Sequence, residues 1–139
     1  MSALKLVISG SYRKHLSELY ALKSFLTAKG FEVLSPSGER AVNPGEEFVI
    51  LNSDPLEDPR ILQDSIFAKM RQASFQVVLN KDGYLGKASI LEIGYAISLG
   101  LQVLTIERVE DPNIAAYTRC FDEVFPDWKH ENCTRQRAS

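Results

Sequence analysis

The sequence has few cysteines and histidines and no long apolar segment. Its two cysteines, Cys120 and Cys133, are too few for a disulfide framework or for a zinc site built from cysteine pairs. No group of His, Cys, Asp and Glu residues has metal-ligand spacing, so we expect no metal, and no motif indicates another cofactor. No apolar run approaches the roughly 20 residues of a membrane-spanning helix, and the N-terminal run is too short for a signal peptide. We therefore expect a cytoplasmic protein that does not bind membranes.

The sequence also lacks an excess of positive charge. Lys and Arg number 16 against 18 Asp and Glu, which gives a net charge of −2. Proteins that bind nucleic acid polymers through counterion release concentrate basic residues, so this balance argues against that class. The 139 residues, 45% hydrophobic and 24% charged, are typical of one globular domain. We expect that domain at residues 1–126 and a loose tail at 127–139.

Short apolar segments alternate with helical patterns along most of the chain. The expected strands are residues 4–9, 31–34, 75–80 and 102–106, and the expected helices are 16–29, 60–73, 89–99 and 113–124. The segment 35–59 holds four prolines and two glycines, and we expect a long functional loop there. Alternation predicts an α/β, flavodoxin-like parallel sheet of four or five strands, order 2-1-3-4(-5), with helices on both faces.

In that strand order, ligands bind at the carboxyl ends of the first and third strands. The first loop at this edge reads Gly10-Ser11-Tyr12-Arg13. Gly10 permits close backbone approach, and the hydroxyl of Ser11 with the guanidinium of Arg13 suits a phosphate or another anion. The alternative is a plain strand-to-helix turn with a solvated arginine. The loop is neither a Walker motif nor a dinucleotide fingerprint.

The second loop at this edge reads Asp82-Gly83-Tyr84-Leu85-Gly86. An aromatic and apolar tip between two glycines is typical of a loop that folds over a ligand. Asp-Gly is also common in ordinary exposed turns, and that alternative remains open.

Glu92 is the one charged residue in the apolar helix expected at 89–99. A carboxylate in such a helix needs a partner, a capping role or a function, because bare burial costs several kcal/mol. The spacing Ser89-x-x-Glu92 matches a capping box, in which the glutamate reaches back to the serine amide. A carboxylate beside a ligand crevice is equally a candidate nucleophile or base. Both roles remain open.

Two segments together resemble a known family. Residues 83–96, Gly-Tyr-Leu-Gly-Lys-Ala-Ser-Ile-Leu-Glu-Ile-Gly-Tyr-Ala, resemble the signature of the nucleoside 2-deoxyribosyltransferase-like superfamily, a glycine-containing loop before a Glu-x-Gly-x-Ala helix. Residues 6–13, Leu-Val-Ile-Ser-Gly-Ser-Tyr-Arg, resemble the first strand and turn of its 2′-deoxynucleoside 5′-monophosphate N-hydrolase branch. The likeness spans residues 4–106.

The resemblance implies a flavodoxin-like fold, a homodimer or higher homo-oligomer, and cleavage or transfer at the N-glycosidic bond of a nucleoside or its 5′-monophosphate. Glu92 matches the catalytic nucleophile of the family, and Ser11 and Arg13 match positions that hold a 5′-phosphate. By position only, Tyr12 and the 35–59 loop flank the base. The residues expected in catalysis are Glu92 and Asp82, and those expected to contact substrate are Gly10, Ser11, Tyr12, Arg13, Gly83, Tyr84, Gly86 and Ser89.

The chain departs from the family pattern at two positions. The family usually carries an aspartate just before the third strand, where this chain has Ser74. Some branches place an acid six residues before the nucleophile, where this chain has Gly86, and Asp82 is the carboxylate expected to replace it. These departures motivate a second hypothesis, a non-catalytic nucleotide-binding or sensing module with a degenerate site.

Overall fold

Five parallel strands form the sheet of this protein, whose computed structural model describes residues 3–37 and 58–128. The strand order is β2-β1-β3-β4-β5, and every neighbouring pair is parallel. The strands are β1 (Lys5–Gly10), β2 (Glu32–Ser35), β3 (Phe75–Leu79), β4 (Gln102–Thr105) and β5 (Thr118–Cys120). This order confirms the flavodoxin-like fold predicted from the sequence, with the fifth strand present. Most of the predicted 35–59 loop lies outside the described residues.

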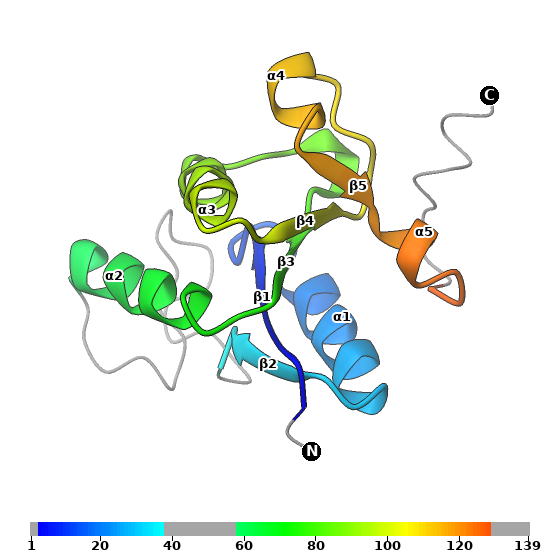
Figure 1. Ribbon diagram of the computed structural model, residues 1–139, viewed down its shortest axis with the longest axis horizontal. Helices are drawn as coiled ribbons and strands as arrows, with labels where there is room; N and C mark the ends of the chain where they lie inside the picture. Colours follow the sequence, from blue (N-terminus) through cyan, green and yellow to red (C-terminus); the bar gives the residue numbers. More distant parts are fainter. Residues whose placement is uncertain (1–2, 38–57, 129–139) are drawn as a thin grey trace.

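Helices cover both faces of the sheet (Figure 1). The long helices are α1 (Leu16–Ala28), α2 (Pro59–Met70) and α3 (Lys87–Ser98), and the single-turn helices are η1 (Lys81–Gly83), α4 (Pro112–Ala115) and α5 (Phe121–Val124). Helices α1 and α5 pack on one face, whereas α2 and α3 pack on the other. No helix in the described ranges combines the length and apolarity needed to cross a membrane.

The central strands are buried on both faces, which explains their nearly continuous apolar sequences. In β1, Leu6 and Ile8 belong to the core under α1, whereas Val7 belongs to the core under α2 and α3. Because side chains alternate along a strand, Ser9 and Gln76 lie on the α2 and α3 face, beside apolar residues such as Val7 and Val78. Thr105 of β4 is a further buried polar residue on that face. Ser9 and Gln76 mark the position of the site.

The predicted helix at 113–124 is wrong. The segment instead forms α4, the edge strand β5 and α5. Asp111 caps the single turn of α4 by accepting hydrogen bonds from the amides of Asn113 and Ile114. Residues 118–120 then pair with β4, which satisfies backbone groups that an unpaired β4 would expose. Phe121, the first residue of α5, follows directly and is completely buried.

The domain extends beyond residue 126, where the sequence predicted a loose tail. Trp128 is buried, with its ring centroid 4.9 Å from Phe25 and 5.8 Å from Phe121. Asp127 forms an ion pair with Lys29 at 2.6 Å. Cys120 is disulfide-bonded, which the sequence did not predict, and the only other cysteine of the chain, Cys133, lies outside the described residues together with the rest of 129–139.

Candidate active site

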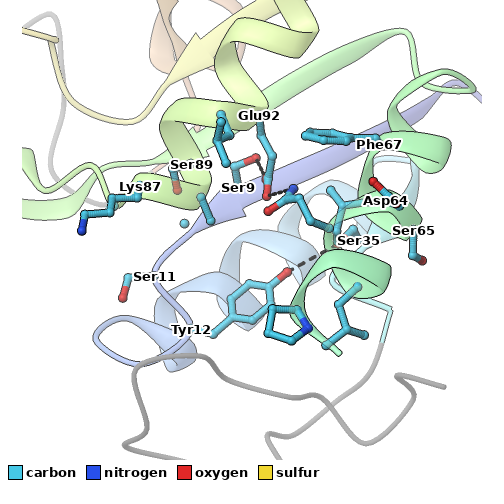
Figure 2. Close-up of a pocket in the computed structure, with 18 of the residues that line it drawn as sticks. Ser9, Ser11, Tyr12, Ser35, Asp64, Ser65, Phe67, Lys87, Ser89 and Glu92 are labelled. Carbon is cyan, nitrogen blue, oxygen red and sulfur yellow. Dashed lines mark hydrogen bonds between the residues drawn. The ribbon is translucent and has the colours of Figure 1, made fainter. Parts of the chain in front are cut away.

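A cavity of about 780 Å³ opens at the carboxyl ends of β1 and β2, between α2 and the first turns of α3 (Figure 2). Its volume lies in the range of small-molecule sites. Eight of the predicted site residues line it, and they are Gly10, Ser11, Tyr12, Arg13, Tyr84, Gly86, Ser89 and Glu92. Two sequence segments that are about 80 residues apart therefore meet at one cavity. The predicted position, between the first and third strands, is wrong, because Ser35 at the end of β2 lines this cavity and no residue of β3 does.

Asp82 and Gly83 do not line this cavity. They line a second cavity of about 510 Å³ together with Asn80 and Glu107. The backbone of Asp82 is left-handed, with φ of 59°, and its amide donates to Glu107 Oε2 at 2.7 Å. The amide side chain of Asn80 bonds the backbone of Glu107 in both directions, at 2.9 Å each. These bonds hold the turn toward β4, so the prediction that Asp82 acts beside Glu92 is wrong.

Glu92 lies at the inner wall of the main cavity and is 8% exposed. Its Oε1 accepts a hydrogen bond from Ser9 Oγ at 2.5 Å, and its Oε2 accepts one from Gln63 Nε2 at 2.9 Å (Figure 2). Ser9 Oγ in turn accepts a hydrogen bond from Gln76 Nε2 at 2.8 Å. The carboxylate is therefore fixed through both oxygens, one to the sheet and one to α2.

The predicted capping box is wrong. Helix α3 begins at Lys87, two residues earlier than predicted, and its N-cap is Gly86. Ser89 is consequently the third helical residue, and Glu92 lies in the second turn, facing the sheet. The helix is also less buried than predicted, because Ile90 and Leu91 are exposed. Glu92 remains as a buried carboxylate on the cavity wall.

Burial raises the pKa of Glu92 above its usual value of 4.5, and the hydrogen bonds from Ser9 and Gln63 act in the opposite direction. Desolvation disfavours the charged carboxylate, whereas donors stabilise it. A carboxylate that two donors hold in a desolvated wall is poised for nucleophilic or acid–base chemistry.

One side of the cavity presents groups suited to an anion. The N-cap of α3 is Gly86, which has no side chain to cap the first turn, and Lys87 lies at the first helical position. Figure 2 shows Lys87, Ser89 and Ser11 along this side, from α3 and from the loop after β1. Arg13 lines the same cavity and is exposed. Uncapped amides at a helix start attract negative charge, and basic side chains add to that attraction.

Gly10 has a packing role that the sequence did not reveal. A Cβ atom at this position would lie 3.1 Å from Leu19 Cδ2 and 3.2 Å from the Cβ of Leu79. The glycine therefore lets the end of β1 pack against α1 and β3. This contact fixes where the loop that carries Ser11 begins.

Tyr84 lines the cavity, and two residues at the start of α1 hold its ring. Lys14 Nζ lies 4.5 Å from the ring centroid, and the His15 ring meets it edge-on at a centroid distance of 6.4 Å. His15 is buried. An ion pair of 2.8 Å between Lys81 and Glu18 ties the same loop to α1, and the hydrogen bond from Lys81 lowers the pKa of Glu18 to about 2.

No sequence pattern pointed to Gln63 or Gln76, and none gave a definite role to Asp64. Gln76 is the one polar residue inside the strand Phe75–Leu79, which is the signal that could have identified it. Gln63 and Asp64 lie in an amphipathic helix, where polar residues are ordinary. Asp64 lines the cavity and is exposed, and its Oδ2 lies 3.8 Å from Nε of Arg60. Among the described residues, no group of three or more His, Cys, Asp or Glu is placed to hold a metal ion.

Ser74 lies far from the cavity. It precedes β3 at the amino end of the sheet, where its amide donates to the carbonyl of Lys5 at 2.8 Å. The cavity lies at the carboxyl ends of the parallel strands, the opposite edge. Ser74 is therefore not among the residues that line the cavity.

Comparison with known proteins gives a structural relation only. No protein-family model and no curated protein matches this sequence. A solved structure that resembles it is the CMP N-glycosidase BcmB of Clostridium botulinum, with a TM-score of 0.54, 12% sequence identity and 82% of each chain covered. The two proteins therefore share a fold.

Proposed function

We propose that this protein cleaves or transfers the N-glycosidic bond of a nucleoside or its 5′-monophosphate, with Glu92 as the nucleophile. The observation that carries the proposal is the buried carboxylate on the cavity wall, held by two donors beside an anion-attracting edge. Two further findings support it. The residues around Glu92 resemble the nucleoside 2-deoxyribosyltransferase-like signature, and the structural neighbour BcmB is a CMP N-glycosidase.

The chemistry proceeds in two steps. A carboxylate oxygen of Glu92 forms a bond to C1′ of the sugar while the bond from C1′ to the base nitrogen breaks. The departing base keeps the electron pair of that bond and takes a proton, and Asp64, the other carboxylate on the cavity wall, is placed to pass it from solvent. Water, or a second base in a transferase, then attacks C1′, releases Glu92 as carboxylate and loses its proton to solvent.

The remaining cavity residues divide between the two ends of the substrate. Ser11, Lys87 and the α3 amides, which lie along one side of the cavity, hold the 5′-phosphate together with Arg13, which also lines the cavity. Tyr12 and Phe67 also line the cavity and offer rings that stack on a base. Tyr12 is kept in place through a 3.4 Å hydrogen bond to Ser35.

A panel of nucleosides and their 5′-monophosphates, screened for base release by chromatography, tests this function. We expect Glu92→Gln and Glu92→Ala to abolish release from any responsive substrate. The matched control is Glu32→Gln, because Glu32 is exposed at the amino end of β2. Unchanged turnover in both Glu92 variants would remove Glu92 from the mechanism.

The alternative function is a non-catalytic nucleotide-binding module. The sequence motivated it through Ser74, but the structure places Ser74 at the opposite edge of the sheet. Calorimetry separates the two functions, since saturable nucleotide binding without base release over hours favours the binding module.

A further inference from the structure

Gln76 has no evident packing reason to be polar. It lies in β3, is fully buried, and shares its face of the sheet with the apolar residues Val7 and Val78. Burial of an amide is unfavourable unless its groups are paired. Its Oε1 has no hydrogen-bond partner among the described residues, whereas its Nε2 donates to Ser9 Oγ at 2.8 Å. The hydrogen bond that the Gln76 amide donates to Ser9 is therefore the interaction that accounts for a polar residue at this position.

That donor sets the direction of the Ser9 hydroxyl. A serine hydroxyl has one proton to donate and lone pairs to accept. Because Gln76 Nε2 can only donate, the oxygen of Ser9 accepts from it. The serine proton is then directed at Glu92 Oε1, at 2.5 Å, a distance typical of a hydrogen bond to a carboxylate.

We propose that Gln76 is a positioning residue that acts through Ser9 to fix the orientation of Glu92 and to favour its ionised form. The chain Gln76–Ser9–Glu92 joins the two central strands to α3. The second support of Glu92, Gln63, comes from α2 and is only partly buried. The catalytic purpose of this relay rests on the proposed function, but the relay itself is testable without any substrate.

Among the described residues, four other charged side chains line the cavity of Glu92, and they are Arg13, Arg60, Asp64 and Lys87. None of these four forms a described hydrogen bond or ion pair with Glu92, and Gln63 and Ser9 are neutral. The protonation of Glu92 therefore responds chiefly to burial and to its two donors.

The test is a carbon-13 NMR titration of the Glu92 side-chain carboxyl in protein labelled at glutamate, with the signal assigned through Glu92→Gln. We expect Ser9→Ala to move the titration midpoint upward by roughly one pH unit, the loss of one hydrogen bond to a charged group. Gln76→Met, which keeps the side-chain length, moves the midpoint in the same direction by a smaller amount. The double variant matches Ser9→Ala, because Gln76 acts only through Ser9.

The matched control is Thr105→Val, which removes a buried hydroxyl that has no partner among the described residues, on the same face of the adjacent strand β4. It leaves the midpoint unchanged. A wild-type midpoint in Gln76→Met, or a Gln76 effect that persists without Ser9, overturns the relay. Should Gln76→Met fail to fold, Gln76→Asn withdraws the amide by one methylene and gives the same comparison.

Activity separates failure of the relay from failure of the proposed function. In an active protein, the acid limb of the kcat/KM profile moves with the NMR midpoint in Ser9→Ala and Gln76→Met. A purely structural role for Gln76 lowers kcat/KM at every pH and leaves that limb in place. If no substrate releases its base while the NMR midpoints shift as expected, the glycosidase proposal is refuted and the relay stands.

Discussion

Glu92 shows how one buried side chain opposes the stability of the fold. Because burial raises its pKa above 4.5, the folded state binds the Glu92 proton more tightly than the unfolded state does. The contribution of this group to stability therefore falls as pH rises from 4.5 through the raised pKa, and the full cost is present above it. This is the usual balance at a reactive carboxyl, where function requires an unfavourable environment.

This balance predicts a pH-dependent effect of Glu92→Gln on stability. The variant carries no titrating group, so its free energy of unfolding relative to wild type should rise as pH increases above 4.5. Urea unfolding of both proteins between pH 4 and pH 8 measures the difference. A difference that is constant across this range would show that burial does not shift the pKa of Glu92.

At the same scale, residue chemistry identified some of the site and missed other parts. Glu92 was singled out because a charge in an apolar helix is unusual, and Ser11 because it follows a strand at the ligand edge. Asp82 was wrongly included in the site because it is close to Tyr84 in the sequence. The sequence did not reveal that the backbone amide of Asp82 donates a hydrogen bond to Glu107. Gln63 contacts Glu92 across 29 residues of sequence, a pairing that no local pattern encodes.

The N-terminal half of α3 carries both the proposed phosphate site and the proposed nucleophile. Its first turn contributes Lys87 to the cavity wall, and its second turn carries Glu92. Under this proposal, a phosphate at the helix start would be held at a fixed distance from Glu92, because both lie on one rigid element. The sequence predicted this helix but placed its start two residues late.

This arrangement predicts that basic residues discriminate between nucleotides and nucleosides. We expect Arg13→Ala and Lys87→Ala each to raise KM for a 5′-monophosphate by roughly tenfold, and KM for the free nucleoside hardly at all. The control is Arg108→Ala, since Arg108 lines the second cavity. Equal effects on both substrates would contradict a phosphate site.

The fold was predictable at the scale of elements wherever periodicity was strong. The first seven predicted strands and helices agree with the observed bounds within three residues, and the single turn η1 was not predicted. Residues 113–124 were not predictable, because pairing with β4 overrides helical propensity for three of them. Tertiary contacts also bury Trp128, and local sequence patterns do not show such contacts, so the residue was predicted to lie in a loose tail.

At the scale of the whole molecule, Phe25 of α1, Phe121 of α5 and Trp128 pack together as an aromatic cluster. Trp128→Ala removes a buried indole packed against Phe25 and Phe121, so we expect a loss of about 3 kcal/mol in the free energy of unfolding. Urea denaturation measures this loss. Tyr117→Ala is the control, because Tyr117 is 60% exposed, and an equal loss in both variants would refute the packing role.

The hydrogen bond between Ser9 and Glu92 joins residues 83 positions apart in the chain. Closing a loop of this length has an entropic cost that local contacts do not have. No short segment of the polypeptide can hold the carboxylate in this setting, since residues of β1, β3, α2 and α3 all contribute to it. The raised pKa of Glu92 therefore depends on the assembled fold, and a refolding chain should recover it only when these four elements have come together.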